Sequence, residues 1–527
     1  MREYNVILKR DIDYDEFWND IESDTDSGKL YIPNRRVEFT NERPASLRQC
    51  WYLLTDEEAE QLKLDDRVYD VEIPPEHRTD IVMMPKEVQQ GDFTKTSLDT
   101  GAYLNWGLVR SNSTTNNYGT NTSISESYIY SLAGNGIDVV IQDSGLQIDH
   151  PEFTDKNGNS RVRQIEWGSY SGGAFTQNIN HYRDFDGHGT HVAGIVAGKT
   201  YGWAKKADIY SVKVAGLEGS GDSGTGISVT YCFDVIKAWH NNKPTIPNGY
   251  KRPTVVNMSW GYGTFYNSVT SVNYRGTSYT DSSTTGNASY RETTYGLLNK
   301  SGANAGYTYV ANVRISSVDA DVQEMIDAGI IVCIAAGNRS FKVDTSSGTD
   351  YNNYVVTDQN TTYYHRGSSP YDDEAIIVGS LDSTVYNASN DQKATYSECG
   401  PGVTIYAPGT NIMSACSTTN AFSGENYYAN PTYRQTNISG TSMASPQVAG
   451  ICALLMESNP KMTPAQLKAN LLANAGTAVY SVVSNNDWSA NNTLKGGEAK
   501  VAYNKFNSVE SSKISGLTMT GLSFRII

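Results

Sequence analysis

The chain has 527 residues, of which 38% are hydrophobic and 19% charged, with a net charge of −15 and a pI near 5.0. This composition argues against a disordered chain, a basic nucleic-acid surface and attraction to an anionic membrane. The longest apolar stretch, 329–337, is about half of what a membrane span needs. We therefore expect no nucleic-acid and no membrane partner.

The first 80 residues are acidic, with 21 Asp and Glu against 11 Lys and Arg, and carry most of the net charge. Thr55 followed by Glu58 is a capping-box pattern at a helix start. The expected elements are a strand at 4–8, a helix at 13–22, strands at 36–39 and 50–54, a helix at 55–64 and a strand at 68–73. This β-α-β-β-α-β order is the split βαβ arrangement of an α+β, ferredoxin-like domain.

Charged residues follow the short apolar run at 6–8, so the sequence predicts no export signal. We expect synthesis in the cytoplasm, with a virus-encoded protein or one released by lysis as a further reading.

Residues 81–100 are expected to be a linker, and 101–507 a second domain in which short apolar strands alternate with helices. The strands are expected at 139–142, 209–214, 254–258, 330–334 and 375–378, and the helices at 188–197, 226–239, 318–328, 442–457 and 463–473. This alternation predicts an α/β fold, a parallel sheet with helices on both faces.

Two polar segments, 262–317 and 340–363, interrupt this pattern, and we expect surface insertions without cores of their own. The first is rich in tyrosine, which leaves open a solvated loop or a binding surface. Residues 508–527 form a tail for which no structure is predicted.

Three motifs carry chemistry. An apolar strand ends at Asp143, a Gly-rich turn opens a helix at His188, and another turn opens a helix at Ser442. In a parallel sheet the strand ends and the following helix starts share one edge, so these side chains can converge.

A serine hydroxyl becomes nucleophilic when an imidazole accepts its proton, and a carboxylate holds that imidazole in the right tautomer. The developing oxyanion needs fixed hydrogen-bond donors. Ser442, at a helix start, offers its backbone N–H, and Asn338, at the end of an apolar strand, offers a side-chain amide.

These motifs resemble those of the subtilases, the subtilisin-like serine peptidases, over roughly residues 100–507. Segments 198–207 and 499–504 are most similar to the proteinase K branch. The resemblance implies Asp143 as orienting carboxylate, His188 as general base and acid, Ser442 as nucleophile and Asn338 as oxyanion donor. No cofactor is implied for the chemistry.

The resemblance also implies that an extended polypeptide substrate binds as an added strand. Its two edges would be formed by Gly219, Ser220 and Gly221 and by Ser259, Trp260 and Gly261. The pocket before the scissile bond would be walled by Ala335, Ala336 and Gly337. Trp260 stands where the family usually has Leu and is expected to narrow the pocket for the fourth residue before the cleavage point.

The N-terminal domain, 1–80, resembles the subtilase propeptide, which implies an intramolecular inhibitor and folding aid that is cut off within 77–100. The resemblance to the proteinase K branch also implies a structural calcium site at Asp382. His188 and His191 could form a metal pair, but no third ligand lies nearby in sequence, so His191 is expected to be a packed helix residue. Cys333 and Cys452 are expected to be buried thiols, while pairing of Cys399 with Cys416 stays open.

The leading interpretation is a serine endopeptidase made as a self-inhibited zymogen. The alternative is a subtilase-fold component of an assembly, conceivably viral, with silent or latent peptidase activity. An esterase is excluded, because the segment around Ser442 lacks the second Gly of a G-x-S-x-G elbow. The sequence does not indicate an oligomeric state.

Overall fold

A computed structural model describes most of the chain. The described residues are 1–22, 35, 37, 39–43, 45–85, 105–116, 128, 130–171, 183–214, 227–247, 249–298, 307–385, 390–422, 424–479, 488 and 493–506. The predicted tail and most of the predicted linker lie outside these residues.

The N-terminal unit is an antiparallel sheet of order β2-β3-β1-β4 with two helices. Its elements are β1 (Arg2–Leu8), α1 (Tyr14–Glu22), β2 (Phe39–Glu42), β3 (Gln49–Leu54), α2 (Asp56–Leu62) and β4 (Val68–Glu72). The predicted element order is confirmed, and Thr55 and Glu58 form the predicted capping box. The strand expected at 36–39 falls partly on residues outside the described ones, and β2 continues to Glu42.

The second unit is built on a large sheet of order β20-β19-β16-β11-β6-β8-β7, with β21 paired to β19. The pairs are parallel except β19 with β20. Its strands are β6 (Asp138–Asp143), β7 (Val162–Arg163), β8 (Asp208–Lys213), β11 (Thr254–Met258), β16 (Ile331–Ala335), β19 (Ile376–Val385), β20 (Asp391–Lys393) and β21 (Ile405–Pro408).

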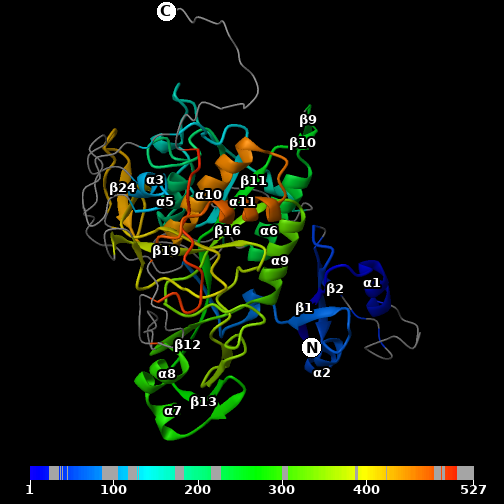
Figure 1. The fold of residues 1–527 in the computed structure, drawn as a ribbon. Coiled ribbons are helices and arrows are strands. Elements are labelled where there is room, and N and C mark those ends of the chain that lie inside the picture. The colour runs from blue at the N-terminus through cyan, green and yellow to red at the C-terminus, as the bar shows by residue number, and fades with distance from the viewer. Residues whose placement is uncertain are drawn as a thin grey trace, which may run out of the picture.

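Helices cover both faces of this sheet, as predicted (Figure 1). Along β6 the side chains of Val139 and Ile141 enter one hydrophobic cluster and that of Val140 enters the other, because neighbouring strand residues point to opposite faces. One cluster includes α3 (Trp106–Arg110), α5 (His188–Ala197), α10 (Thr441–Ser458) and α11 (Pro464–Asn474), and the other includes α6 (Val229–Asn241) and α9 (Ser316–Asp327).

The two polar segments do not behave as separate surface loops. Strands from both join into a sheet of order β14-β13-β17-β18, which buries its own hydrophobic cluster. The expectation that they lack a core is therefore wrong, because tyrosines supply much of the apolar area and the two segments contribute jointly. The buried tyrosines of this cluster are Tyr266, Tyr295 and Tyr364.

This lobe comprises β12 (Trp260–Tyr266), β13 (Val269–Tyr274), β14 (Thr277–Tyr279), α7 (Ser282–Gly286), α8 (Ala288–Tyr295), β15 (Tyr309–Asn312), β17 (Tyr354–Thr357) and β18 (Thr361–Tyr363). In Figure 1 it projects away from the large sheet. The remaining elements are η1 (Pro75–His77), β5 (Val82–Pro85), η2 (Pro151–Phe153), α4 (Trp167–Tyr170), β9 (Thr245–Ile246), β10 (Tyr250–Lys251), β22 (Ile412–Cys416), β23 (Glu425–Asn426) and β24 (Arg434–Ile438).

The N-terminal unit lies beside α9 (Figure 1). The Glu72 carboxylate accepts hydrogen bonds from the backbone N–H groups of Ser316 (3.2 Å) and Ser317 (2.9 Å), which start α9. The first N–H groups of a helix lack partners inside it, so this carboxylate caps α9. The chain leaving the unit then forms β5, which pairs antiparallel with β12.

All six cysteines are buried, and none of them forms a disulfide. This confirms the expectation for Cys333 and Cys452 and leaves Cys399 and Cys416 unpaired with each other. Within the described ranges, no helix is long and apolar enough to cross a bilayer.

Candidate active site

Asp143 and His188 meet at one edge of the large sheet. Asp143 is the last residue of β6 and His188 the first of α5, and the His188 Nδ1 lies 2.7 Å from the Asp143 Oδ1. Both side chains are buried. The predicted convergence of the first two motifs is therefore present as a direct hydrogen bond.

Glycines in the His188 motif are required by close packing. A side chain on Gly189 would place its Cβ 2.1 Å from the carbonyl oxygen of Gly145, in the turn that follows β6. Gly187 has φ of 94°, a left-handed conformation that favours glycine. These two positions let the helix start approach the strand end closely enough for the Asp143 to His188 contact.

Asp184 joins the turn after β6 to the start of α5, although it lies outside the three sequence motifs. One oxygen of its buried carboxylate accepts from Gly187 N–H (2.8 Å), Asp186 N–H (3.1 Å) and the Ser144 hydroxyl (3.0 Å). The other accepts from the backbone N–H of Thr190 at 2.9 Å and from its hydroxyl. Asp184 thereby ties the residue after Asp143 to the first turn of the helix that carries His188.

The carboxylates around His188 favour the protonated form of its imidazole. Burial alone would lower the pKa of His188, but the carboxylates of Asp143, Asp186 and Asp184 outweigh burial and raise that pKa above its ordinary value. Burial raises the pKa of Asp186 to about 6. The His188 Nε2 has no hydrogen-bond partner among the described residues, so the nitrogen opposite Asp143 is available for chemistry.

Ser442 stands in the first turn of α10, which begins at Thr441. Its hydroxyl donates to the carbonyl oxygen of Ser259 (3.2 Å), and the Ser259 hydroxyl donates back to the Ser442 carbonyl oxygen (3.1 Å). The nucleophile candidate is thus tied directly to the predicted substrate strand.

Asn338 lies beside Ser442 because Thr441 binds it. The Asn338 Oδ1 accepts from both the backbone N–H and the hydroxyl of Thr441, each at 2.8 Å. The Thr441 hydroxyl also accepts from Gly337 N–H (3.1 Å). Thr441, which is not among the predicted site residues, therefore fixes the amide next to the candidate nucleophile.

The predicted substrate edge already carries a strand. Pro85 pairs with Trp260 and Met84 with Gly261 in the antiparallel β5–β12 ladder. The backbone of the segment that leaves the N-terminal unit therefore occupies the edge predicted for substrate. Trp260 is fully buried, with its ring 6.2 Å from that of Phe233.

The opposite predicted edge, Gly219, Ser220 and Gly221, lies outside the described residues. The residues predicted to wall the pocket lie at the end of β16 and directly after it, and Ala335 and Ala336 are both buried. Gly337 has φ of 122°, and a Cβ there would lie 2.6 Å from the Glu398 side chain. Glycine is therefore needed at this wall both for its backbone conformation and for space.

The described residues contain no cluster of three or more His, Cys, Asp or Glu side chains that could hold a metal ion. The calcium site expected at Asp382 stays a prediction. His191 packs in the helix as expected: its Nε2 lies 3.0 Å from the carbonyl oxygens of both Ile412 and Thr436. Burial lowers the pKa of His191 to about 3.

Comparison with known proteins identifies the family of this chain. Residues 134–504 match the Subtilase family, Peptidase S8. An extracellular serine proteinase from Thermus sp. (strain Rt41A) is 27% identical over 81% of this chain and 71% of its own length. A subtilisin-like serine protease of Cochliobolus lunatus is 29% identical over 72% of this chain and 57% of its own length.

Among solved structures, fervidolysin from Fervidobacterium pennivorans, described as a keratinolytic enzyme related to subtilisin, aligns over 96% of this chain and 60% of its own. Its TM-score is 0.50 at 17% identity, which supports the fold alone. The family match covers most of the chain and includes Asp143, His188, Asn338 and Ser442. The chain belongs to the subtilase family and is a serine endopeptidase of subtilisin-like fold.

Proposed function

We propose that this protein hydrolyses peptide bonds through Asp143, His188 and Ser442, and that it is made as a zymogen inhibited by its N-terminal unit. The observation that carries the catalytic part is the 2.7 Å contact between His188 Nδ1 and Asp143 Oδ1 at the sheet edge that also holds Ser442. Asp143 would orient the imidazole and stabilise its protonated form.

In the proposed reaction the Ser442 hydroxyl turns from Ser259 to the unused Nε2 of His188. His188 accepts the hydroxyl proton as Ser442 Oγ attacks the substrate carbonyl carbon, and it then donates that proton to the leaving amine. The Ser442 backbone N–H and the Asn338 amide would stabilise the oxyanion. Water attacks the acyl-enzyme in the second half, with His188 as base again.

The inhibitory part rests on β5. Because its backbone pairs with Trp260 and Gly261, a second extended peptide cannot pair with the same edge of β12. We expect autocatalytic cleavage on the C-terminal side of Pro85, within 86–100. This expectation narrows the predicted cleavage site from 77–100 to 86–100.

The test follows the N-terminus of the purified chain over time. Wild type should lose about its first 90 residues, and sequencing should find the new N-terminus between 86 and 101. Ser442→Ala should stay full length. Equal processing of the two chains would show that another protease cuts the protein.

The alternative, a silent component of an assembly, predicts a folded wild-type chain that stays uncut and hydrolyses no peptide. The same time course, with added unfolded casein as substrate, separates the two functions.

A further inference from the structure

Arg43 of the N-terminal unit is a fully buried arginine. Arginine is rarely buried unless its charge is paired, because removing a guanidinium from water is costly. Arg43 follows β2 directly, yet its main partners lie in the peptidase unit, 191 and 278 residues further along the chain.

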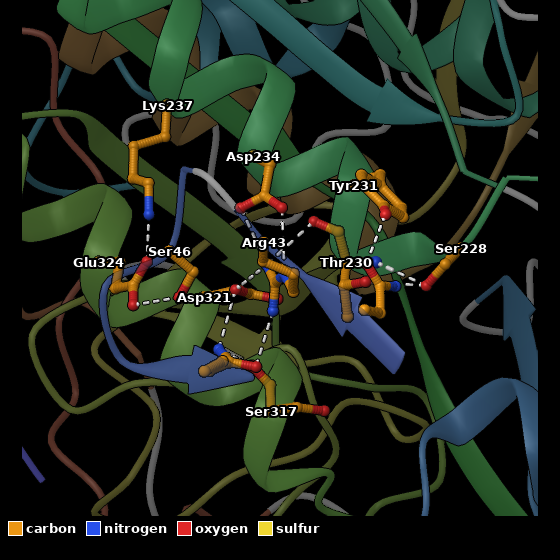
Figure 2. Close-up of polar contacts among 12 residues, drawn as sticks. Arg43, Ser46, Ser228, Thr230, Tyr231, Asp234, Lys237, Ser317, Asp321 and Glu324 are labelled. Carbon is orange, nitrogen blue, oxygen red and sulfur yellow. Dashed lines mark hydrogen bonds and ion pairs between the residues drawn. The ribbon is translucent and has the colours of Figure 1, made fainter. Parts of the chain in front are cut away.

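Two helices of the peptidase unit share this guanidinium (Figure 2). Asp234 of α6 binds it through two parallel hydrogen bonds, Nε to Oδ2 at 3.0 Å and Nη2 to Oδ1 at 2.9 Å. Asp321 of α9 accepts from Nη2 at 2.7 Å. Bidentate pairing of this kind is geometrically selective and suits arginine better than lysine.

Neighbouring groups of the N-terminal unit complete the contact. Gln49 accepts from Arg43 Nη1 (2.7 Å) and donates to Asp321 (3.1 Å). Ser46 donates to Glu324 (2.7 Å), whose other oxygen pairs with Lys237. The same small surface therefore binds carboxylates on both helices, and of their oxygens only Asp321 Oδ2 has no partner among the described residues.

The charge balance shows what Arg43 contributes. The peptidase unit brings three buried carboxyl groups and one lysine to this surface, so without Arg43 its ionised carboxylates would outnumber its cations. We propose that Asp234, Asp321 and Glu324 form an arginine-recognition site, here called the carboxylate socket, whose ligand is the Arg43 guanidinium and which anchors the N-terminal unit to the peptidase unit.

Arg10 provides a natural comparison, because it also reaches from the N-terminal unit to α9. It pairs with Asp327 and Glu374, whose side chains are 43% and 54% exposed. Exposed ion pairs contribute little, whereas leaving a buried charge without its partner is strongly destabilising. The anchoring effect should therefore be specific to Arg43.

The test measures how often the N-terminal unit opens in the full chain carrying Ser442→Ala. Amide hydrogen exchange at Ser316 and Ser317 reports opening, since Glu72 holds these two N–H groups only when the unit is docked. Arg43→Met should accelerate their exchange by at least about 100-fold. The matched control Arg10→Met should change it by less than about fivefold. Equal effects of the two substitutions, or no effect of Arg43→Met, would overturn the proposal.

A third chain covers the case in which Arg43→Met does not fold. Adding Asp234→Asn and Asp321→Asn to Arg43→Met removes the uncompensated charges and should bring exchange back to within about tenfold of the parent. Exchange as fast as in Arg43→Met alone would contradict a charge-based socket.

The proposal rests on the N-terminal unit being the docked module of the proposed function, but none of these chains needs to cut a peptide. A negative exchange result leaves the proposed peptidase reaction standing. Conversely, a wild-type chain without proteolytic activity would overturn the proposed reaction and leave the socket untouched.

Discussion

The two buried charge clusters of this protein differ in what they leave unsatisfied. In the carboxylate socket every nitrogen of Arg43 donates a hydrogen bond, and among the carboxylate oxygens of the described socket residues only Asp321 Oδ2 has no partner. At the candidate active site His188 Nε2 and Asp143 Oδ2 have no hydrogen-bond partner in the described chain. A buried polar atom without a partner costs free energy, so one kept at a reaction centre is available to a reacting group. The first cluster is suited to holding a unit in place, and the second to exchanging protons.

The largest effect should come from removing the charge beside His188. Asp143→Asn should reduce kcat by about 10⁴-fold, because the imidazole loses the acceptor that sets its tautomer and stabilises its protonated form. Steady-state hydrolysis of a peptide substrate measures this. Docking of the N-terminal unit, read from Ser316 exchange in chains carrying Ser442→Ala, should stay unchanged. A combined loss of activity and docking would mean that the two clusters are not independent.

Asn338→Ala should lower kcat by about 10²- to 10³-fold with a small change in KM, as expected for a donor used mainly in the transition state. Since Thr441 also loses its acceptor, thermal unfolding must be measured alongside kinetics. A KM effect without a kcat effect would assign Asn338 to substrate binding instead.

Asp184→Asn should have a smaller effect and lower kcat/KM by about tenfold. The side-chain oxygen that asparagine keeps can still accept hydrogen bonds from Gly187 and Ser144. Asp184 is one of the carboxylates that raise the pKa of His188. Losing its charge should therefore shift the acidic limb of the pH profile for kcat/KM to lower pH. A purely structural role would lower the rate without moving this limb.

The smallest expected effect is the change in docking of the N-terminal unit with pH. Burial raises the pKa of Glu72 to about 7, with Asp70 and Arg78 as its charged neighbours. A carboxyl with a raised pKa in the docked state stabilises docking below its ordinary pKa near 4.5, and this contribution is lost as the pH rises through 7. Opening should therefore increase from pH 5 to pH 8.

Hydrogen exchange at Ser316 in the Ser442→Ala chain, corrected for the intrinsic pH dependence of exchange, measures this trend. Glu72→Gln keeps a hydrogen-bond acceptor but does not titrate, so it should flatten the response. Docking that tightens with rising pH would contradict the assigned role of Glu72. Asp321, whose pKa is also raised by burial, would leave a residual slope of the same sign.

The sequence predicted the parts that depend on local pattern. Strand and helix order, the capping box at Thr55 and the positions of Asp143, His188 and Ser442 all follow from periodicity and short motifs. Asp184 was missed because an Asp four residues before a helix start is common, although its place as a candidate cap for that helix was a usable signal.

The remaining features depend on contacts between distant segments. The polar lobe has a core because β13 pairs with β17, some 80 residues later, and tyrosine rings pack between them. The carboxylate socket joins three segments across as many as 278 residues. Periodicity within one segment carries no information about such pairings, so Arg43 looked like any other charged residue of an acidic domain.

The central claim, that Ser442 is an activated nucleophile, is tested most directly by labelling with a fluorophosphonate followed by peptide mapping. The processed wild-type chain should carry one phosphonyl group on Ser442, and Asp143→Asn should label far more slowly. A folded, processed chain that stays unlabelled, or that carries the label on another serine, would contradict it.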